Sequence, residues 1–487
     1  MSAPFIWIVV PGLAAFLLFI FRLWKRAALV ASIVLALLLA WLAWQLPVGE
    51  SFSLRLWAGF PSFKISESVT ILDQRFTLEQ TQTPLLILLY LGLALWLGGA
   101  YTANADRLFP ALSFGIAAVL AASLAAESSQ FATLTIIIVA LLCVPILSPP
   151  RMPAGRGVIR LLAFQTLGAC LILFSDAYLT AIGIEPGRSD AVRLAVSLTS
   201  LGFALCLAVF PFHSWFPMLG ETGNPYTHAF VFLILPVAIF SSILEYLNRF
   251  TLLGLSSEIY PLIRYAGVLM VLSGGVGAVF ERHLGRLLAF AATVQIGSGL
   301  LALSLVGEGA NSSFTTAIFY ANLVSFAVGM AVGSQALTAL QKGAASLSFP
   351  SLRGLAFRKP IASFSAVLAL FSLAGLPLLA SFPIDLALWS ELVQESWLVS
   401  LSALLGSASL LAAGLFSLAA LLSSPPQAAG ETPETGPAPV GAVTLERGFQ
   451  AVILVLGCLA LFVVGLMPNW LFSFLGNLAQ ISTGPVP

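Results

Sequence analysis

Charged residues are scarce in this chain of 487 residues. Asp, Glu, Lys and Arg make up only 8% of it, against roughly a quarter in soluble proteins, and 59% is hydrophobic. This composition excludes a soluble globular protein and predicts a polytopic membrane protein. The net charge of +1, with no block of like charges, gives no indication of a nucleic-acid partner.

Cysteine, histidine and lysine are also rare. The cysteines lie in apolar runs without Cys-x-x-Cys or Cys/His spacing, so no iron–sulfur site, zinc site or disulfide framework is predicted. No flavin, haem or quinone motif occurs, so we expect no cofactor. Any electron chemistry would therefore belong to partner subunits.

Apolar runs of about 20 residues, the length of one membrane crossing, recur along the chain. We predict an all-α protein with about fourteen transmembrane helices, at 4–22, 27–46, 84–101, 108–126, 130–149, 158–179, 191–211, 226–247, 262–280, 287–306, 314–340, 361–396 with a break, 398–424 and 449–468.

The same pattern predicts how the chain is organised. Alternating apolar and polar residues at 47–83 predict an extramembrane hairpin, and a Pro/Gly/Ala-rich stretch predicts a flexible loop. The expected parts are N-terminal helices with the hairpin (1–101), a first repeat (108–247), a second repeat (262–424), the loop (425–448), and a last helix with a short tail (449–487).

Two of the predicted spans are interrupted by proline. The breaking residues are Pro211, Trp215 and Pro217 in the first span, and Pro377 and Pro383 in the second. Proline removes a backbone donor, and irregular backbone at membrane depth is tolerated only where protein or a water-filled cavity surrounds it. Five helices per repeat would invert the second repeat relative to the first, and inverted repeats with discontinuous helices are typical of transporters.

Basic residues are unevenly distributed between the two sets of loops. Most of the 21 Lys and Arg residues fall on one side, which the positive-inside tendency makes cytoplasmic. We therefore predict an integral protein of the prokaryotic inner (plasma) membrane with both termini non-cytoplasmic.

Three segments resemble motifs of one protein family. Residues 211–217 (PFHSWFP) resemble a P-x-H-x-W-L-P loop, residues 281–290 resemble a D-L-K-R-L-L-A-Y segment, and residues 372–382 resemble S-L-x-G-x-P…G-F. The family comprises the antiporter-like membrane subunits of respiratory complex I (NADH:quinone oxidoreductase), membrane hydrogenases and Mrp-type Na⁺/H⁺ antiporters. The resemblance covers about residues 50 to 425. It implies membership of a multi-subunit complex, with antiporter paralogs, redox-module subunits and membrane lipids as partners.

Most of the charged residues that are thought to relay protons in that family are missing here. Cys206 stands where the resemblance places the seventh-span lysine, and the eighth-span lysine would fall near Val237 or Ala238. Nothing acidic lies near Thr135 or Ile136, where the fifth-span glutamate is expected. The lysines of this chain, Lys25, Lys64, Lys342 and Lys359, all lie in predicted loops.

The twelfth-span site alone keeps a charge, at Asp385. An ionisable group at membrane depth costs at least ~2.5 kcal/mol, so it is a functional candidate by default. Asp385 would accept a proton or act as counter-ion to a neighbouring subunit; alternatively, it caps the broken helix.

Three further residues are candidates for an ion path: His213, His228 and Asp176. His213 would titrate near neutral pH as a relay, or satisfy loose carbonyls at the break. His228 opens the next span and would line the same cavity, whereas Asp176 near a span end is expected at the membrane interface. Buried neutral residues such as Gln165 and Gln295 would join helices or hold water.

We therefore predict a membrane-arm subunit of a proton- or cation-translocating complex, with a degenerate proton path and no catalytic site of its own. The alternative is an active proton or Na⁺/H⁺ antiporter that uses Asp385, His213, His228 and Asp176. A membrane enzyme or lipid-handling protein on the same scaffold would need a polar pocket with paired acids or a metal set at one surface, and no loop supplies one beyond Glu391 and Glu395.

Overall fold

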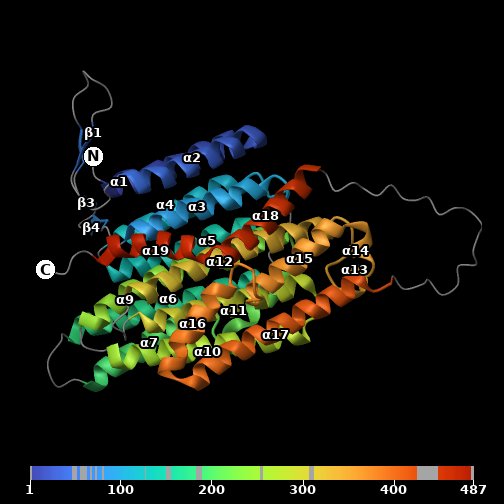
Figure 1. The fold of residues 1–487 in the computed structure, drawn as a ribbon. Coiled ribbons are helices and arrows are strands. Elements are labelled where there is room, and N and C mark those ends of the chain that lie inside the picture. The colour runs from blue at the N-terminus through green and yellow to red at the C-terminus, as the bar shows by residue number, and fades with distance from the viewer. Residues whose placement is uncertain are drawn as a thin grey trace, which may run out of the picture.

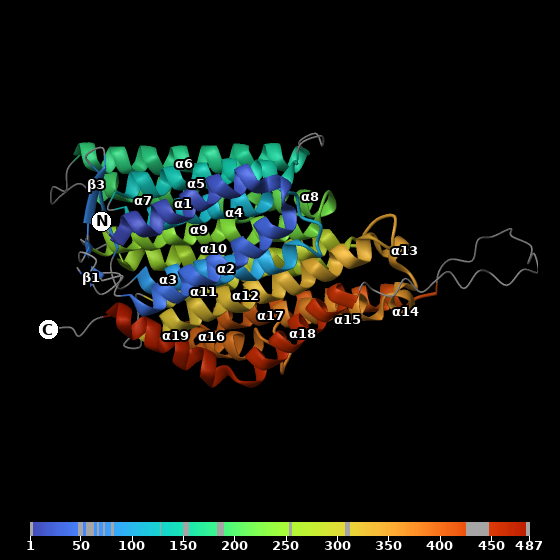
Figure 2. The same ribbon diagram turned by 90° about the horizontal axis from the view of Figure 1, so that it is seen from above.

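The computed structural model describes residues 3–46, 52–54, 63–65, 68–71, 74–78, 82–126, 128–149, 155–182, 189–252, 256–306, 312–424 and 448–483. Within them, long helices lie side by side in one bundle (Figures 1 and 2). Eleven helices are long and apolar enough to cross a membrane, and shorter apolar helices lie at Phe109–Ala125, Val192–Cys206 and Pro360–Leu373. Helices satisfy their own backbone groups, as hydrocarbon requires. The predicted all-α polytopic membrane protein is confirmed.

The N-terminal part holds α1 (Ala3–Ile20), η1 (Phe21–Leu23), α2 (Lys25–Gln45) and α3 (Thr83–Ala100). The expected hairpin is in fact two antiparallel pairs, β1 (Phe52–Leu54) with β2 (Phe63–Ile65) and β3 (Ser68–Ile71) with β4 (Gln74–Thr77). Phe76 of β4 pairs with Ala126 and packs edge-on against Phe131, which holds the second pair against the helices.

The next helices contain the first discontinuity. They are α4 (Phe109–Ala125), α5 (Ser129–Leu147), α6 (Arg156–Ile182), α7 (Ser189–Cys206), η3 (Phe212–Ser214), α8 (Trp215–Glu221) and α9 (Pro225–Leu252). The span expected at 191–211 thus ends its helix at Cys206, and the chain resumes as η3 and α8 after Pro211.

The following helices contain the second discontinuity, between α15 and α16. They are α10 (Ser256–Phe280), α11 (Leu284–Leu305), α12 (Ser312–Gln341), α13 (Phe349–Leu352), α14 (Leu355–Arg358), α15 (Pro360–Leu373), α16 (Phe382–Glu395) and α17 (Trp397–Leu422).

The C-terminal part differs from the sequence expectation. After α18 (Gly448–Leu466), residues expected to form a short tail instead form α19 (Pro468–Thr483). Pro468 stands at the first helical position, where proline is well tolerated. The flexible loop expected at 425–448 lies, except for Gly448, outside the described residues.

Helix α11 lies at the centre of the bundle. Apart from Arg286, every one of its residues is buried. It contacts α8, α9, α10, α12, α15, α16 and α17, so both discontinuous spans pack against it.

Candidate functional site

The first break is a capped helix end. Helix α7 stops because Ala208 adopts a left-handed conformation (φ 60°). The N–H of Val209 donates to the Ala204 carbonyl (2.9 Å), and the N–H of Ala208 donates to the Leu205 carbonyl (3.3 Å). This pair of hydrogen bonds is a Schellman motif.

The second break has the same construction. Gly375 is left-handed (φ 73°), the N–H of Leu376 donates to the Phe371 carbonyl (3.0 Å), and the N–H of Gly375 donates to the Ser372 carbonyl (3.0 Å). Ala208 and Gly375 thus occupy equivalent positions in the two motifs, and alanine is strained in the conformation that glycine adopts freely.

A buried glutamine supports each break at the same carbonyl. Nε2 of Gln165 on α6 donates to the Cys206 carbonyl (2.8 Å), and Nε2 of Gln295 on α11 donates to the Leu373 carbonyl (2.7 Å). Each acceptor lies two residues before the left-handed residue. In both glutamines Oε1 is buried without a hydrogen-bond partner, so each break presents an unpaired acceptor to the protein interior.

Asp385 lies beside the second break, in the first turn of α16. It is 2% exposed, and its Oδ2 has no hydrogen-bond partner. The hydroxyls of Ser372 and Ser381 are also buried and unpaired. Such polar atoms are places where water or a proton is held inside a protein. The N-cap position of α16 is occupied by Ser381, and Asp385 lies four residues after it.

Two of the three histidines, His213 and His228, lie in or just after the first discontinuous span. His213 in η3 is half-buried, stacks on Phe210 (ring centroids 5.5 Å apart) and lies near Phe290 of α11 (6.2 Å). His228, near the start of α9, is buried beside the Leu147 backbone. Nδ1 of both rings and Nε1 of buried Trp215 lack partners.

Asp176 lies near the end of α6 (Arg156–Ile182). It is 1% exposed and accepts a hydrogen bond from the Ser129 hydroxyl (3.0 Å). The start of α5 therefore covers the carboxylate from one side. In the described part of the chain, no hydrogen bond, ion pair or ring contact joins any two of Asp385, His213, His228 and Asp176.

The position of the family's seventh-span lysine is closed by helix packing. Cys206 is buried, and its Sγ lies 3.9 Å from the Gln165 carbonyl oxygen. A Cβ placed on Gly168 of α6 would lie 2.5 Å from this sulfur and 2.6 Å from the Gly202 carbonyl oxygen of α7. Two glycines let α6 and α7 approach this closely, so the Cys206 side chain lies against the α6 backbone.

Lysines lie instead at helix ends. Nζ of Lys25 donates to the Ala105 carbonyl (2.9 Å), Nζ of Lys342 to Thr102 (2.8 Å) and Nζ of Lys359 to Ala339 (2.6 Å). Ala339 lies in the last turn of α12, where a cation stabilises the helix terminus. The side chain of Lys64 lies outside the described residues.

His283 begins α11 as its N-cap, and its Nδ1 accepts the N–H of Arg286 (3.4 Å). Arg286 pairs with Glu221 and, at 3.7 Å, with Glu281. Burial lowers the pKa of His283 from its ordinary 6.5; Glu221 and Glu281 raise this pKa, and Arg286 lowers it. The neutral ring is therefore the capping form.

This cap predicts a stability change with pH. Around pH 6 the folded protein binds fewer protons at His283 than the unfolded chain, so stability should fall as pH drops below about 6.5. The loss should be at most about 1 kcal/mol, the scale of a lost N-cap. Thermal unfolding in detergent at pH 7.5 and 5.5 measures it. His283→Asn keeps a capping residue without titration and should reduce the difference; an unchanged difference would assign it to other groups.

Two discontinuous helices that flank one wholly enclosed helix, with unpaired polar atoms at both breaks, define a transporter-type membrane subunit. Residues 178–412 match the family model for NADH:quinone oxidoreductase/Mrp antiporter transmembrane proteins. Over these residues, just under half of its length, the chain is similar to this family of antiporter-like membrane subunits.

Curated relatives are NADH-quinone oxidoreductase N subunits. The protein from Moorella thermoacetica is 27% identical over 298 residues, which cover 60% of this chain and 58% of the relative. The protein from Cereibacter sphaeroides is 30% identical over 285 residues, which cover 56% of this chain and 60% of the relative. These matches span less than two thirds of either relative.

Solved structures share the fold at low identity. A chain of the Mrp complex from Dietzia sp. matches with a TM-score of 0.76 and 18% identity, covering 100% of this chain and 98% of that one. A chain of respiratory complex I from Thermus thermophilus matches with a TM-score of 0.71 and 19% identity, covering 96% of this chain and 98% of that one.

Proposed function

We propose that this chain is a membrane-arm subunit of a proton- or cation-translocating complex of the NADH:quinone oxidoreductase type, and that its own proton path is degenerate. Antiporter paralogs and redox-module subunits would be its partners in a prokaryotic inner membrane. The relatives support this class, since both are NADH-quinone oxidoreductase subunits.

The observation that carries the degenerate path is the packing around Cys206. A relay needs ionisable groups or water in continuous reach, and here α6 and α7 meet through Gly168 and Gly202 at that level. An uncompensated proton in such dry surroundings is costly. The subunit would therefore transmit conformational change or complete the membrane arm without conducting protons itself.

The same proposal includes fourteen crossings in two inverted repeats, α4–α9 and α10–α17. Supporting it, both units contain a Schellman-capped break with a glutamine on the equivalent carbonyl. With both termini non-cytoplasmic, the segment after α3, where Lys25 and Lys342 bind carbonyls, and the end of α12, where Lys359 binds, would face the cytoplasm.

The alternative is an active proton or Na⁺/H⁺ antiporter. The unpaired oxygens of Asp385, Gln295, Ser372 and Ser381 around the second break favour it, because they would hold an ion or a file of water. Under this alternative Asp385 is the group that accepts the proton.

Proton flux through the purified full-length protein in liposomes distinguishes the degenerate path from the active antiporter. With a potassium diffusion potential and an internal pH dye, proton entry should match that of protein-free liposomes within about twofold, and Asp385→Asn should change nothing. A pH-dependent H⁺ or Na⁺ flux that falls at least tenfold in Asp385→Asn would contradict the degenerate path and support the antiporter.

Partner identity needs a separate measurement. The tagged chain, solubilised from its native membrane in mild detergent, should co-purify with redox subunits or antiporter paralogs in fixed stoichiometry. Recovery of the chain alone would contradict the membrane-arm assignment.

A further inference from the structure

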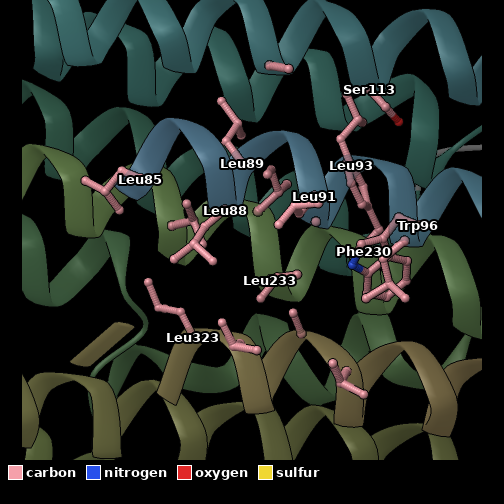
Figure 3. A pocket seen from close by; sticks show the side chains of 18 of the residues that line it. Leu85, Leu88, Leu89, Leu91, Leu93, Trp96, Ser113, Phe230, Leu233 and Leu323 are labelled. Atoms are coloured by element: carbon pink, nitrogen blue, oxygen red, sulfur yellow. The ribbon is translucent and has the colours of Figure 1, made fainter. Parts of the chain in front are cut away.

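An elongated apolar cavity of about 260 Å³ lies between α3, α4, α9, α12 and α19. Figure 3 shows leucines of α3 facing Leu233 of α9 and Leu323 of α12 across it. The described residues that line it include no charged side chain. None of them belongs to either helix break, so a ligand in this cavity would be independent of the proton path.

The cavity is long and narrow. Along α3 its lining runs from Leu85 to Trp96, and eleven residue steps of a helix cover about 16 Å. Its inner side is buried, with Phe230, Leu93 and Leu233 only 1%, 5% and 5% exposed, and its outer side is open at Leu91 and Leu95, each 40% exposed. A helix about 10 Å wide would not enter without parting these walls, whereas an extended hydrocarbon chain fits a slot of this shape.

Among the described lining residues, one buried polar group has no hydrogen-bond partner. Trp96 is 1% exposed, and its indole N–H makes no hydrogen bond. The ring is fixed by Tyr226 and Phe230, at centroid distances of 4.8 and 5.6 Å, and its nitrogen lies on the side toward Leu233 (Figure 3). The Ser113 hydroxyl is already bonded to the Phe109 carbonyl. An acceptor in the cavity would satisfy the buried donor.

Trp96 also lies at a particular depth. It stands four residues before the end of α3 at Ala100, which is about 6 Å along a helix. Tyr101 follows and contacts Phe449 and the exposed Arg26. Tryptophan, tyrosine and arginine gather where acyl chains meet headgroups, the level at which ester carbonyls occur.

We propose that the cavity binds one acyl chain of a membrane phospholipid, with the Trp96 indole N–H donating to its ester carbonyl. The chain fills the slot along α3 down to Leu85. Arg26, at the level of Tyr101, is placed to meet the phosphate of the headgroup.

The protein provides a matched pair of positions for the test. A Cβ on Gly92, which lines the cavity, meets nothing within 4 Å, and neither does a Cβ on Gly98, which lies on the same helix but does not line it. Gly92→Phe therefore fills the cavity without a backbone clash, and Gly98→Phe is its control. Trp96→Phe keeps an aromatic ring and removes the N–H.

Native mass spectrometry of the detergent-washed full-length protein measures how much lipid each chain retains. The bound lipid is then extracted and identified. The wild-type protein and Gly98→Phe should retain one phospholipid per chain. Occupancy should fall at least tenfold in Gly92→Phe and about fivefold in Trp96→Phe, the effect of one net hydrogen bond.

Three results would overturn the proposal: no retained phospholipid on the wild-type protein, equal retention by Gly92→Phe and Gly98→Phe, or an isoprenoid quinone in its place. If Gly92→Phe is not monodisperse, the test rests on Trp96→Phe. If Trp96→Phe then retains as much phospholipid as the wild-type protein, the N–H contact is wrong.

Discussion

Substitution of Gly375 by alanine should destabilise the folded protein by about 2 to 4 kcal/mol. Gly375 is left-handed (φ 73°), and a Cβ there would lie 2.5 Å from Oδ2 of Asp385. The left-handed conformation alone costs a non-glycine residue about 1 to 2 kcal/mol. The rest of the loss comes from displacing a buried carboxylate that α16 holds in place. Unfolding in detergent, followed by intrinsic fluorescence, measures the change.

Two further variants separate these contributions. Gly98→Ala on α3 adds a Cβ in open space and should be neutral or stabilise by up to about 1 kcal/mol. In the double variant Gly375→Ala/Asp385→Ala the clash is gone and only the backbone strain remains, so the two losses should not add. If Gly375→Ala alone matches the wild type, the close approach of the carboxylate is wrong.

Introducing lysine at Cys206 should not restore a proton path. The site is 1% exposed and enclosed by Gly168 and the Gln165 carbonyl, so the longer side chain has to part α6 from α7. The ammonium adds a cost of at least ~2.5 kcal/mol at membrane depth. We expect Cys206→Lys to lose at least about 3 kcal/mol of stability and to gain no proton flux in liposomes.

Cys206→Ala is the control for this experiment, since it removes only the sulfur and should cost about 1 kcal/mol. A stable Cys206→Lys protein that conducts protons would show that the two helices separate readily. The loss of proton conduction would then be due to one missing side chain rather than to the packing of α6 against α7.

Both discontinuities could be predicted from the sequence because proline acts locally. Pro211 and Pro377 each follow a left-handed residue within three positions, and neither the missing N–H nor the steric clash depends on the rest of the fold. Apolar length predicted most helix positions for a similar reason, as hydrocarbon leaves the backbone no alternative.

The roles of the glutamines could not be predicted in the same way. Gln165 and Gln295 stood out only as polar residues in apolar helices, and which carbonyl each one meets depends on the register between helices. The burial of Asp176 depends on α5, and the closure of the Cys206 site depends on glycines of two helices meeting. The apolar cavity left no signal in the sequence, because it arises where packing between several helices is incomplete.

The enclosure of α11 has a consequence for how the protein is made. A helix with no lipid-facing side cannot reach its final surroundings when it first enters the bilayer, because α12, α15, α16 and α17 that surround it are synthesised later. Until then its buried Thr293, Gln295 and Ser298 face lipid or the insertion machinery. Biogenesis must therefore hold a half-built bundle open, and a chain interrupted after α11 would be a substrate for membrane quality control.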